Sequence, residues 1–332
     1  MHTRENALHD WLNKIIPNSD FIVMPLTGDA SFRRYFRLSY DNSTRIIMDA
    51  PPDKITLEPF INIGKLLSKH GFLTPTIHAI EPQQGFVLLD DFGDNLFLQT
   101  ITPFNADSLY KTAINTLNHM QECTTDTLEP FNKKFMLDEL SQFRDWFLER
   151  YLDLTLDSNE ELLLENTYAW ITNLIANQPM VFIHRDYHSR NIMLLPPASD
   201  NSPRLGIIDF QDAMQGPFTY DLVSLLKDCY IQWPREKIIE WVDFFYAHSP
   251  IAHSYSQNEF HRAFDLCGLQ RHLRVLGTFC RLHLRDNKSN YLNHLPLTYE
   301  YMITCLETYE ELRPFLMFIQ NRVQPIFLSK VK

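Results

Sequence analysis

The first hundred residues contain short segments in which hydrophobic and polar positions alternate, the pattern of strands buried on one face. Strands are therefore predicted at residues 21–27, 35–40, 44–50, 76–80 and 85–90. Asp41 and Asn42, between the second and third segments, are typical of a hairpin turn. Apolar residues at helical spacing predict one helix between the third and fourth strands, ending before Gly71. The expected order is three strands, one helix and two strands.

From residue 106 onward the apolar residues recur at the period of a helix. Long helices are predicted at residues 106–121, 133–154, 158–177 and 257–285. Short apolar runs at residues 180–183, 192–195 and 205–208 border polar loops and predict short strands. The change of period near residues 90–95 predicts an α+β protein of two lobes. Residues 1–91 would form a small antiparallel sheet with one helix, and residues 92–332 a larger, mainly helical lobe.

Composition narrows the class of protein. The chain has 332 residues, of which 45 % are hydrophobic, enough for two lobes with buried cores. Its formal net charge of -11 would repel phosphate backbones, so no nucleic-acid partner is expected. The five cysteines lack metal-binding spacing and predict reduced, buried thiols. No apolar run has the length of a membrane span and no leader pattern opens the chain, so we expect a cytoplasmic enzyme without a membrane partner.

The strongest chemical signal lies in two polar segments that follow short apolar runs. The segment HRDYHSRN begins where the run at 180–183 ends, and it contains Asp186 and Asn191. The second segment begins with Asp209, after the run at 205–208. Phosphoryl transfer needs such groups: Asp186 can accept the proton of a substrate hydroxyl, while Asn191 and Asp209 offer hard oxygens to Mg²⁺. The alternative is a structural polar loop whose Asp and Asn cap turns.

The order and spacing of these segments resemble the protein-kinase-like superfamily. HRDYHSRN matches its H-x-D-x-x-x-x-N catalytic loop, and IIDFQD occupies the place of its metal-binding D-F-G. His188 and the short chain look like the aminoglycoside phosphotransferase and choline kinase branch. The resemblance implies a two-lobed protein-kinase-like fold. Its first lobe would bind ATP, and its second would carry the catalytic base, the Mg²⁺ ligands Asn191 and Asp209, and the substrate site.

The same resemblance assigns nucleotide contacts to two segments of the first lobe. The backbone near Leu89 and Asp91 would bind the adenine edge; the alternative is an ordinary connector. The D-F-G at residues 91–93 precedes the catalytic loop, so it is not the metal-binding triplet. The phosphate loop TGDASFRRYFR has Gly28 and Ser31 in the G-x-x-S form of the aminoglycoside branch.

One departure from the superfamily concerns the third strand, where kinases usually carry a lysine and this chain has Met48. An arginine of the first lobe is expected to supply the missing charge. Arg33 and Arg34 are preferred for their loop position, with Arg37 as a further candidate. The alternative is a nucleotide-binding pseudokinase that acts as an interaction protein.

Longer strings narrow the resemblance to one family. GDASFRRYFRL, MDAPP, DFQDAMQGPFTYDLVSLLKDCY and GLQRHLRVLGTFCRLHLRDNKSNYL look like the bacterial anomeric N-acetylmuramate/N-acetylglucosamine kinases, and the resemblance runs over residues 11–296. It implies ATP-dependent phosphorylation of the C1 hydroxyl of an amino sugar, in cytoplasmic recycling of cell-wall peptidoglycan. A kinase for an aminoglycoside, choline or another small alcohol is the competing enzyme class.

Four arginines of the predicted helix at 257–285 fall within a sector of about 80°. They are Arg271, Arg274, Arg281 and Arg285. In an acidic protein such a group indicates an anion site, for a substrate carboxylate or for phosphates. Arg271 and Arg274 are the preferred substrate contacts, and an ion-paired or solvated face is the alternative.

The remaining polar residues near the predicted catalytic loop have two kinds of expected role. His188 and Arg190 are expected either to contact the substrate or to support the loop. His184 and Asp221 are expected to be structural, with Asp221 either capping the helix that it opens or bracing the loop.

Overall fold

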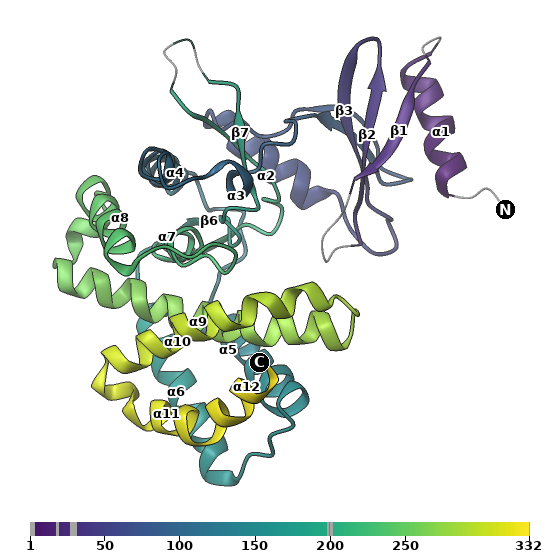
Figure 1. Cartoon of the computed structure of the whole chain (residues 1–332). Coiled ribbons are helices and arrows are strands. Elements are labelled where there is room, and N and C mark those ends of the chain that lie inside the picture. The colour runs from purple at the N-terminus through teal and green to yellow at the C-terminus, as the bar shows by residue number, and fades with distance from the viewer. Residues whose placement is uncertain (1–3, 18–19, 27–31, 198, 200–201, 332) are drawn as a thin grey trace. The chain divides into compact units, whose positions relative to one another are not determined.

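The computed structural model describes residues 4–17, 20–26, 32–197, 199 and 202–331. Its contacts divide the chain into two compact units (Figure 1). The first contains Met1–Thr100 and Arg190–Asp212, and the second contains Ile101–Ser189 and Ala213–Lys332. The chain therefore passes from one unit to the other at residues 100/101, 189/190 and 212/213.

The first unit is built on a five-stranded antiparallel sheet in the order β1-β2-β3-β5-β4. Its strands are Ile22–Leu26 (β1), Arg34–Tyr40 (β2), Ser43–Asp49 (β3), Ile77–Glu81 (β4) and Phe86–Asp90 (β5). The five predicted strands and the helix expected after the third, Glu58–Lys69 (α2), are confirmed. Asp41 and Asn42 have φ of 46° and 57°, so they form the expected tight turn between β2 and β3. A short helix, Phe97–Thr100 (α3), follows the sheet.

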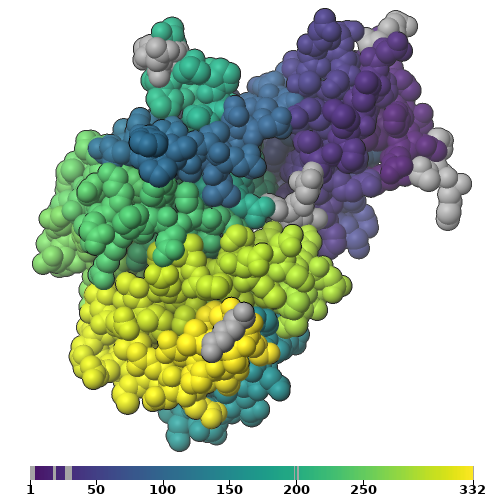
Figure 2. Space-filling view, viewed as in Figure 1, coloured from purple at the N-terminus to yellow at the C-terminus, as the bar shows by residue number. Residues whose placement is uncertain are grey.

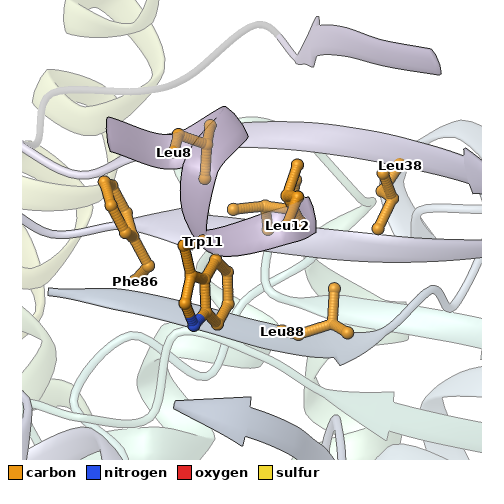
Figure 3. Packing of buried hydrophobic residues seen from close by; sticks show 7 residues of the cluster. Leu8, Trp11, Leu12, Leu38, Phe86 and Leu88 are labelled. Atoms are coloured by element: carbon orange, nitrogen blue, oxygen red, sulfur yellow. The ribbon is translucent and has the colours of Figure 1, made fainter. Parts of the chain in front are cut away.

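A helix that was not expected, Arg4–Ile15 (α1), covers one face of this sheet. Leu8, Trp11 and Leu12 pack against the strands (Figure 3). The Trp11 ring stacks on Phe86, with ring centroids 5.6 Å apart. The expectation that strands open the chain is therefore wrong. The spacing of Leu8, Trp11 and Leu12, one helical turn apart, is the signal that identifies α1.

The strands Ile192–Leu195 (β7) and Arg204–Ile207 (β8) form an antiparallel hairpin within the first unit. The backbone N–H of Ile207 donates to the carbonyl of Leu73 at 2.8 Å. This bond helps to explain why the hairpin belongs to the first compact unit. The boundary predicted from the sequence places the same residues in the second lobe. That boundary at residues 91/92, with the roles given to the lobes, stays a prediction.

The second unit is mainly helical, as predicted. Its longer helices are Ala106–Met120 (α4), Lys133–Gln142 (α5), Ser158–Ala176 (α6), Arg235–His248 (α8), Gln257–Leu284 (α9) and Leu295–Thr308 (α10). Its shorter elements are the π-helix Phe143–Tyr151 (η1), Met180–Ile183 (β6), Met214–Pro217 (β9), Tyr220–Leu226 (α7), Ala252–Ser254 (η2), Ser289–His294 (η3), Glu310–Leu312 (η4), Arg313–Phe318 (α11), Ile319–Val323 (η5) and Gln324–Lys330 (α12). Figure 2 shows the C-terminal segments, in yellow, forming much of one face of this unit. The helix expected at 133–154 is divided into α5 and η1. None of the helices in the described ranges is long and apolar enough to cross a membrane.

Helix α9 has a largely buried surface. It begins with a capping box, in which Ser256 and Glu259 each satisfy a backbone N–H of the other. Gly277 faces the backbone where α5 meets η1, and a Cβ atom at this position would lie 2.2 Å from the carbonyl oxygen of Gln142. Glycine is needed for this close approach, which fixes α9 against α5.

Candidate active site

The loop at residues 184–189 follows strand β6 and is held by buried polar groups. Asp221, in the first turn of α7, accepts from the backbone N–H of His184 at 2.5 Å and of Arg185 at 2.9 Å. Arg185 has φ of 75°, which costs a non-glycine residue about 1–3 kcal/mol unless its surroundings hold it. The Ser224 hydroxyl also donates to the Arg185 carbonyl, at 3.2 Å. The expectation that Asp221 braces the loop is confirmed.

Asp186 lies beside two arginines of α9. Its Oδ1 is 3.5 Å from Nη2 of Arg274 and 3.7 Å from Nη2 of Arg271. The Asp186 side chain is 35 % exposed. Burial raises the pKa of this carboxyl, but the surrounding positive charges, that of Arg274 foremost, outweigh burial, so the pKa falls well below its ordinary value. Asp186 is thus an accessible carboxylate that is ionised at neutral pH, the state required of a general base.

Arg274 is shared between two carboxylates. Its Nη1 lies 3.0 Å from Oε1 of Glu139, a residue of α5 whose side chain is only 7 % exposed. The same Oε1 is 2.9 Å from Nη2 of Arg185, and Gln270 donates to Oε2 at 3.1 Å. Glu139 was not expected from the sequence. Its signal is a glutamate placed three residues after Met136, on the apolar side of a predicted helix.

The four arginines of α9 do not form one cluster. Arg271 and Arg274 converge on the predicted base. Arg281 is half-buried farther along the helix. Arg285, at the C-terminal cap, pairs with Asp286 at 2.8 Å. The candidate anion site is therefore reduced to Arg271 and Arg274, and the ion-paired alternative holds for Arg285.

His188 is buried, and burial lowers the pKa of its imidazole, so the ring is neutral at neutral pH. It meets the ring of Tyr230 edge-on, with centroids 5.2 Å apart. Asp228 accepts from the backbone N–H groups of Ser189 and Tyr230, both at 2.9 Å. Asp228 is thus a second buried brace of the loop, and no sequence motif marked it. Arg190, where the chain enters the first unit, is half-buried.

In the first unit, the two predicted metal ligands lie together. The N–H of Ile208 donates to the carbonyl of Asn191 at 3.1 Å, which aligns the start of β7 with the end of β8. Asn191 Nδ2 lies 3.5 Å from Oδ2 of Asp209, whose side chain is exposed. Asp209 has φ of 63°, a left-handed conformation that aspartate adopts more readily than most residues. Gln211 donates to Oδ1 of Asp209 at 2.8 Å.

This pair fits a magnesium ion. Mg²⁺ usually takes one or two protein oxygens and completes its shell with water and substrate phosphates, so an amide and a carboxylate at this separation suffice. Among the described residues, no group of three His, Cys, Asp or Glu side chains could hold a metal ion. The donor set therefore suits a metal that arrives with a phosphate ligand better than a metal held by protein side chains alone.

Met48, at the position where kinases carry lysine, is fully buried in β3. Tyr35 pairs with it from β2, and the Tyr35 hydroxyl lies 3.6 Å from the Met48 sulfur. Burial raises the pKa of the Tyr35 hydroxyl; the charge of Asp209 adds to this rise and the charge of Arg33 opposes it. The charges of Arg33 and Asp209 thus both act on the Tyr35 hydroxyl, which lies beside Met48.

Arg34 and Arg37 are engaged elsewhere in the first unit. Arg34 pairs with the buried Asp49 at 2.6 Å, and Arg4 of α1 donates to the same carboxylate at 2.6 Å. Arg34 therefore lies on the face of the sheet that α1 covers. Arg37 pairs with Asp91 at 2.7 Å. Sequence position alone did not separate these arginines from Arg33.

The remaining predicted nucleotide residues have different surroundings. Besides its bond to Arg37, the Asp91 carboxylate accepts from the N–H of Gly93 at 2.9 Å, so it shapes the connector after β5. Leu89 is buried in β5, between β3 and β4. Gly28 and Ser31 lie outside the described residues. The adenine and phosphate contacts of these residues stay predictions.

Known proteins resemble this chain at two levels. The model of the phosphotransferase enzyme family matches residues 22–249. The N-acetylmuramate/N-acetylglucosamine kinase of Pseudomonas aeruginosa is 35 % identical over 326 residues, covering 93 % of this chain and 94 % of that protein. The kinase of the same name from Neisseria meningitidis serogroup B is 34 % identical and covers 96 % of each chain.

Among solved structures, choline kinase LicA from Streptococcus pneumoniae matches with a TM-score of 0.63 at 13 % identity. The match covers 90 % of this chain and 99 % of that one. This likeness concerns the fold, and it confirms the expected two-lobed, protein-kinase-like α+β class.

Proposed function

Since this chain belongs to the phosphotransferase enzyme family, within the group of its N-acetylmuramate/N-acetylglucosamine kinases, we propose that it transfers the γ-phosphate of ATP to the anomeric C1 hydroxyl of an N-acetylated amino sugar. N-acetylmuramate and N-acetylglucosamine are the proposed acceptors. The observation that carries the proposal is Asp186, an ionised and partly exposed carboxylate on a braced loop.

Asp186 is the proposed general base. Its carboxylate would take the proton of the C1 hydroxyl while the C1 oxygen forms a bond to the γ-phosphorus and the bond from that phosphorus to ADP breaks. An anomeric hydroxyl is more acidic than an ordinary sugar hydroxyl, so a carboxylate with a lowered pKa suffices. The same low pKa favours release of the proton after transfer.

Asn191 and Asp209 are the proposed magnesium ligands, each through a side-chain oxygen. When bound, Mg²⁺ would offset the negative charge of the ATP phosphates. The bond from Gln211 supports this role because it fixes the orientation of the Asp209 carboxylate. The proposed nucleotide contacts also include Gly28, Ser31 and the backbone near Leu89 and Asp91.

Arg271 and Arg274, with His188 and Arg190, are the proposed acceptor contacts. A guanidinium beside the base suits the lactyl carboxylate of N-acetylmuramate, and it disfavours the cationic groups of choline and aminoglycosides. N-acetylglucosamine lacks that carboxylate and would lose only this pair.

The proposed product belongs to the cytoplasmic recycling of peptidoglycan sugars. All five cysteines are buried free thiols, which suits a reducing compartment.

A coupled ATP assay across amino sugars, aminoglycosides and choline tests the proposed function. We expect turnover with N-acetylmuramate, N-acetylglucosamine or both, and phosphorus NMR should place the product phosphate on C1. A phosphate on C6, or turnover confined to choline or an aminoglycoside, would contradict the proposal. Nucleotide binding with no turnover on any acceptor would favour the pseudokinase that Met48 suggested.

Arg33 is the proposed replacement for the missing strand-three lysine. Arg33→Ala should raise the KM for ATP by about 10- to 100-fold, because a hydrogen bond to a charged group contributes about 1.5–3 kcal/mol. Its charge acts on the Tyr35 hydroxyl beside Met48, as does the charge of Asp209, and this supports the role. Steady-state kinetics with varied ATP measures the effect, and Arg33→Lys should restore much of the affinity.

Arg34→Ala is the matched control, since it removes the same charge one residue away, from a side chain that pairs with Asp49 on the face that α1 covers. It breaks the pair with buried Asp49, so it should lower the melting temperature while the KM for ATP stays near the wild-type value. If both single variants and the double variant keep wild-type ATP kinetics, a residue other than Arg33 or Arg34 supplies the positive charge that binds the ATP phosphates.

A further inference from the structure

Two arginines beside the proposed base meet at one buried carboxylate. Glu139 of α5 lies 3.0 Å from Arg274 of α9 and 2.9 Å from Arg185, the residue that precedes Asp186. Asp186 contacts the other terminal nitrogen of Arg274, at 3.5 Å. Arg274 therefore links a buried carboxylate to the proposed base, and the shorter of its two contacts is the one to Glu139.

We propose that Glu139 is a positioning residue, which holds the Arg274 guanidinium back from Asp186 and so leaves the carboxylate of Asp186 available to the acceptor hydroxyl. This inference rests on the role of Asp186 in the proposed function. Glu139 lies outside every motif described above, and in this role it would set how strongly Arg274 attracts the carboxylate of Asp186.

The physical basis is competition between two anions for one cation. Charge-assisted contacts near 3 Å are strong, and the attraction falls with distance, so Arg274 is held more firmly by Glu139 than by Asp186. Both partners of the shorter pair are largely buried, which strengthens their interaction. When Glu139 loses its charge, Arg274 has Asp186 as its remaining anionic partner of the two and attracts that carboxylate more strongly. Arg185 loses its carboxylate partner at the same time.

The helices restrict how far these side chains can separate. Gly277 of α9 faces the backbone of Gln142, and Thr278 donates to the Gln142 side chain at 3.0 Å. Glu139 and Arg274 each lie about one turn before this close approach, so their spacing is fixed by backbone packing. A buried ion pair is seldom more stabilising than apolar packing, which argues that these charges serve the site and not only the fold.

Glu139→Gln tests the inference, because glutamine keeps the shape of the side chain and removes its charge. We expect kcat to fall by about 10- to 100-fold, as for a misplaced catalytic group, with the KM for ATP within about twofold of wild type. In a double-mutant cycle, Glu139→Gln should lower kcat much less in the Arg274→Gln background than in the wild type, since the residue through which Glu139 acts on Asp186 is gone and only the loss of the Arg185 partner remains. Glu139→Asp, which keeps the charge at a greater distance, should give an intermediate kcat.

Glu160→Gln is the matched control. Glu160 of α6 also pairs with an arginine of the second unit, Arg322 at 2.7 Å, and glutamine can keep its place in the helix capping box. Its kcat should remain at the wild-type value. Additive losses in the cycle, a wild-type kcat in Glu139→Gln, or, if that variant does not fold, a wild-type kcat in Glu139→Asp would overturn the inference.

The identity of the acceptor that the wild-type protein phosphorylates tests the proposed function separately from this inference. Should the wild-type protein phosphorylate an alcohol other than an amino sugar, the proposed acceptor is wrong, and the same cycle measured with that alcohol still decides the role of Glu139. A protein that phosphorylates no acceptor would overturn both, because Asp186 would then be no base.

Discussion

Replacing Asp186 with asparagine should lower kcat by about 10²- to 10⁴-fold, the usual contribution of a general base, while ATP binds nearly as in the wild type. Asparagine has the size of aspartate and still accepts hydrogen bonds, but its amide cannot take the acceptor proton. Asp186 belongs to the second unit, whereas the proposed nucleotide contacts belong to the first. Kinetics with varied sugar and ATP, together with titration of a fluorescent nucleotide, measures turnover and affinity separately.

Asp138→Asn is the control for this prediction, since it makes the same chemical change at an exposed position of α5 and should leave kcat unaltered. A near-normal kcat in Asp186→Asn would remove Asp186 from the role of base. Because the surrounding positive charges, that of Arg274 foremost, outweigh burial and keep the pKa of Asp186 low, ionisation of this carboxyl should affect kcat/KM only in acid, well below neutral pH. Arg274→Gln removes one of these charges, so it should raise that pKa and move the acidic fall in kcat/KM to higher pH.

Replacing Asp209 with alanine should abolish measurable turnover and weaken the binding of Mg-ATP. The carboxylate is the only charged member of the proposed metal pair, and Mg²⁺ binds hard anionic oxygens more strongly than neutral amides. Alanine also has to adopt the φ of 63° found at this position, which adds backbone strain. Asp209→Asn avoids that strain, so a loss shared by both variants reports the carboxylate.

Nucleotide titrations at several magnesium concentrations measure this effect. Both variants should require more magnesium for the same nucleotide affinity, and circular dichroism should show the wild-type fold. Turnover that remains normal and saturates with Mg²⁺ as in the wild type would contradict the assignment of Asp209.

The proposed metal pair could be predicted from the sequence because Asn191 and Asp209 each lie at the end of a predicted strand. Asn191 comes immediately before one apolar run and Asp209 immediately after another, and pairing of the two runs as β7 and β8 brings their polar neighbours together. Glu139 and Asp228 could not be predicted in this way. Glu139 and Asp228 reach the loop at 184–189 because a helix or turn distant in the sequence packs against it. The spacing of residues within either segment does not indicate that contact.

The choice between Arg33 and Arg34 shows the same limit at closer range. Arg34 is the first residue of β2 and Arg33 precedes the strand, so their adjacency in the sequence does not indicate which of them pairs with Asp49. The side of Arg34 is set by Asp49, which is buried where α1 contributes Arg4. The helix that was missed in the sequence therefore also concealed the difference between the two arginines.

The three crossings of the chain between the units limit how this protein can be dissected or recombined. A fragment that ends at residue 100 would contain the whole five-stranded sheet but would lack the β7–β8 hairpin, and with it Asn191 and Asp209. It would also leave the carbonyl of Leu73 without its bond from Ile207. Exchange of the first unit between relatives therefore requires replacing two separate segments of the recipient chain, residues 1–100 and residues 190–212.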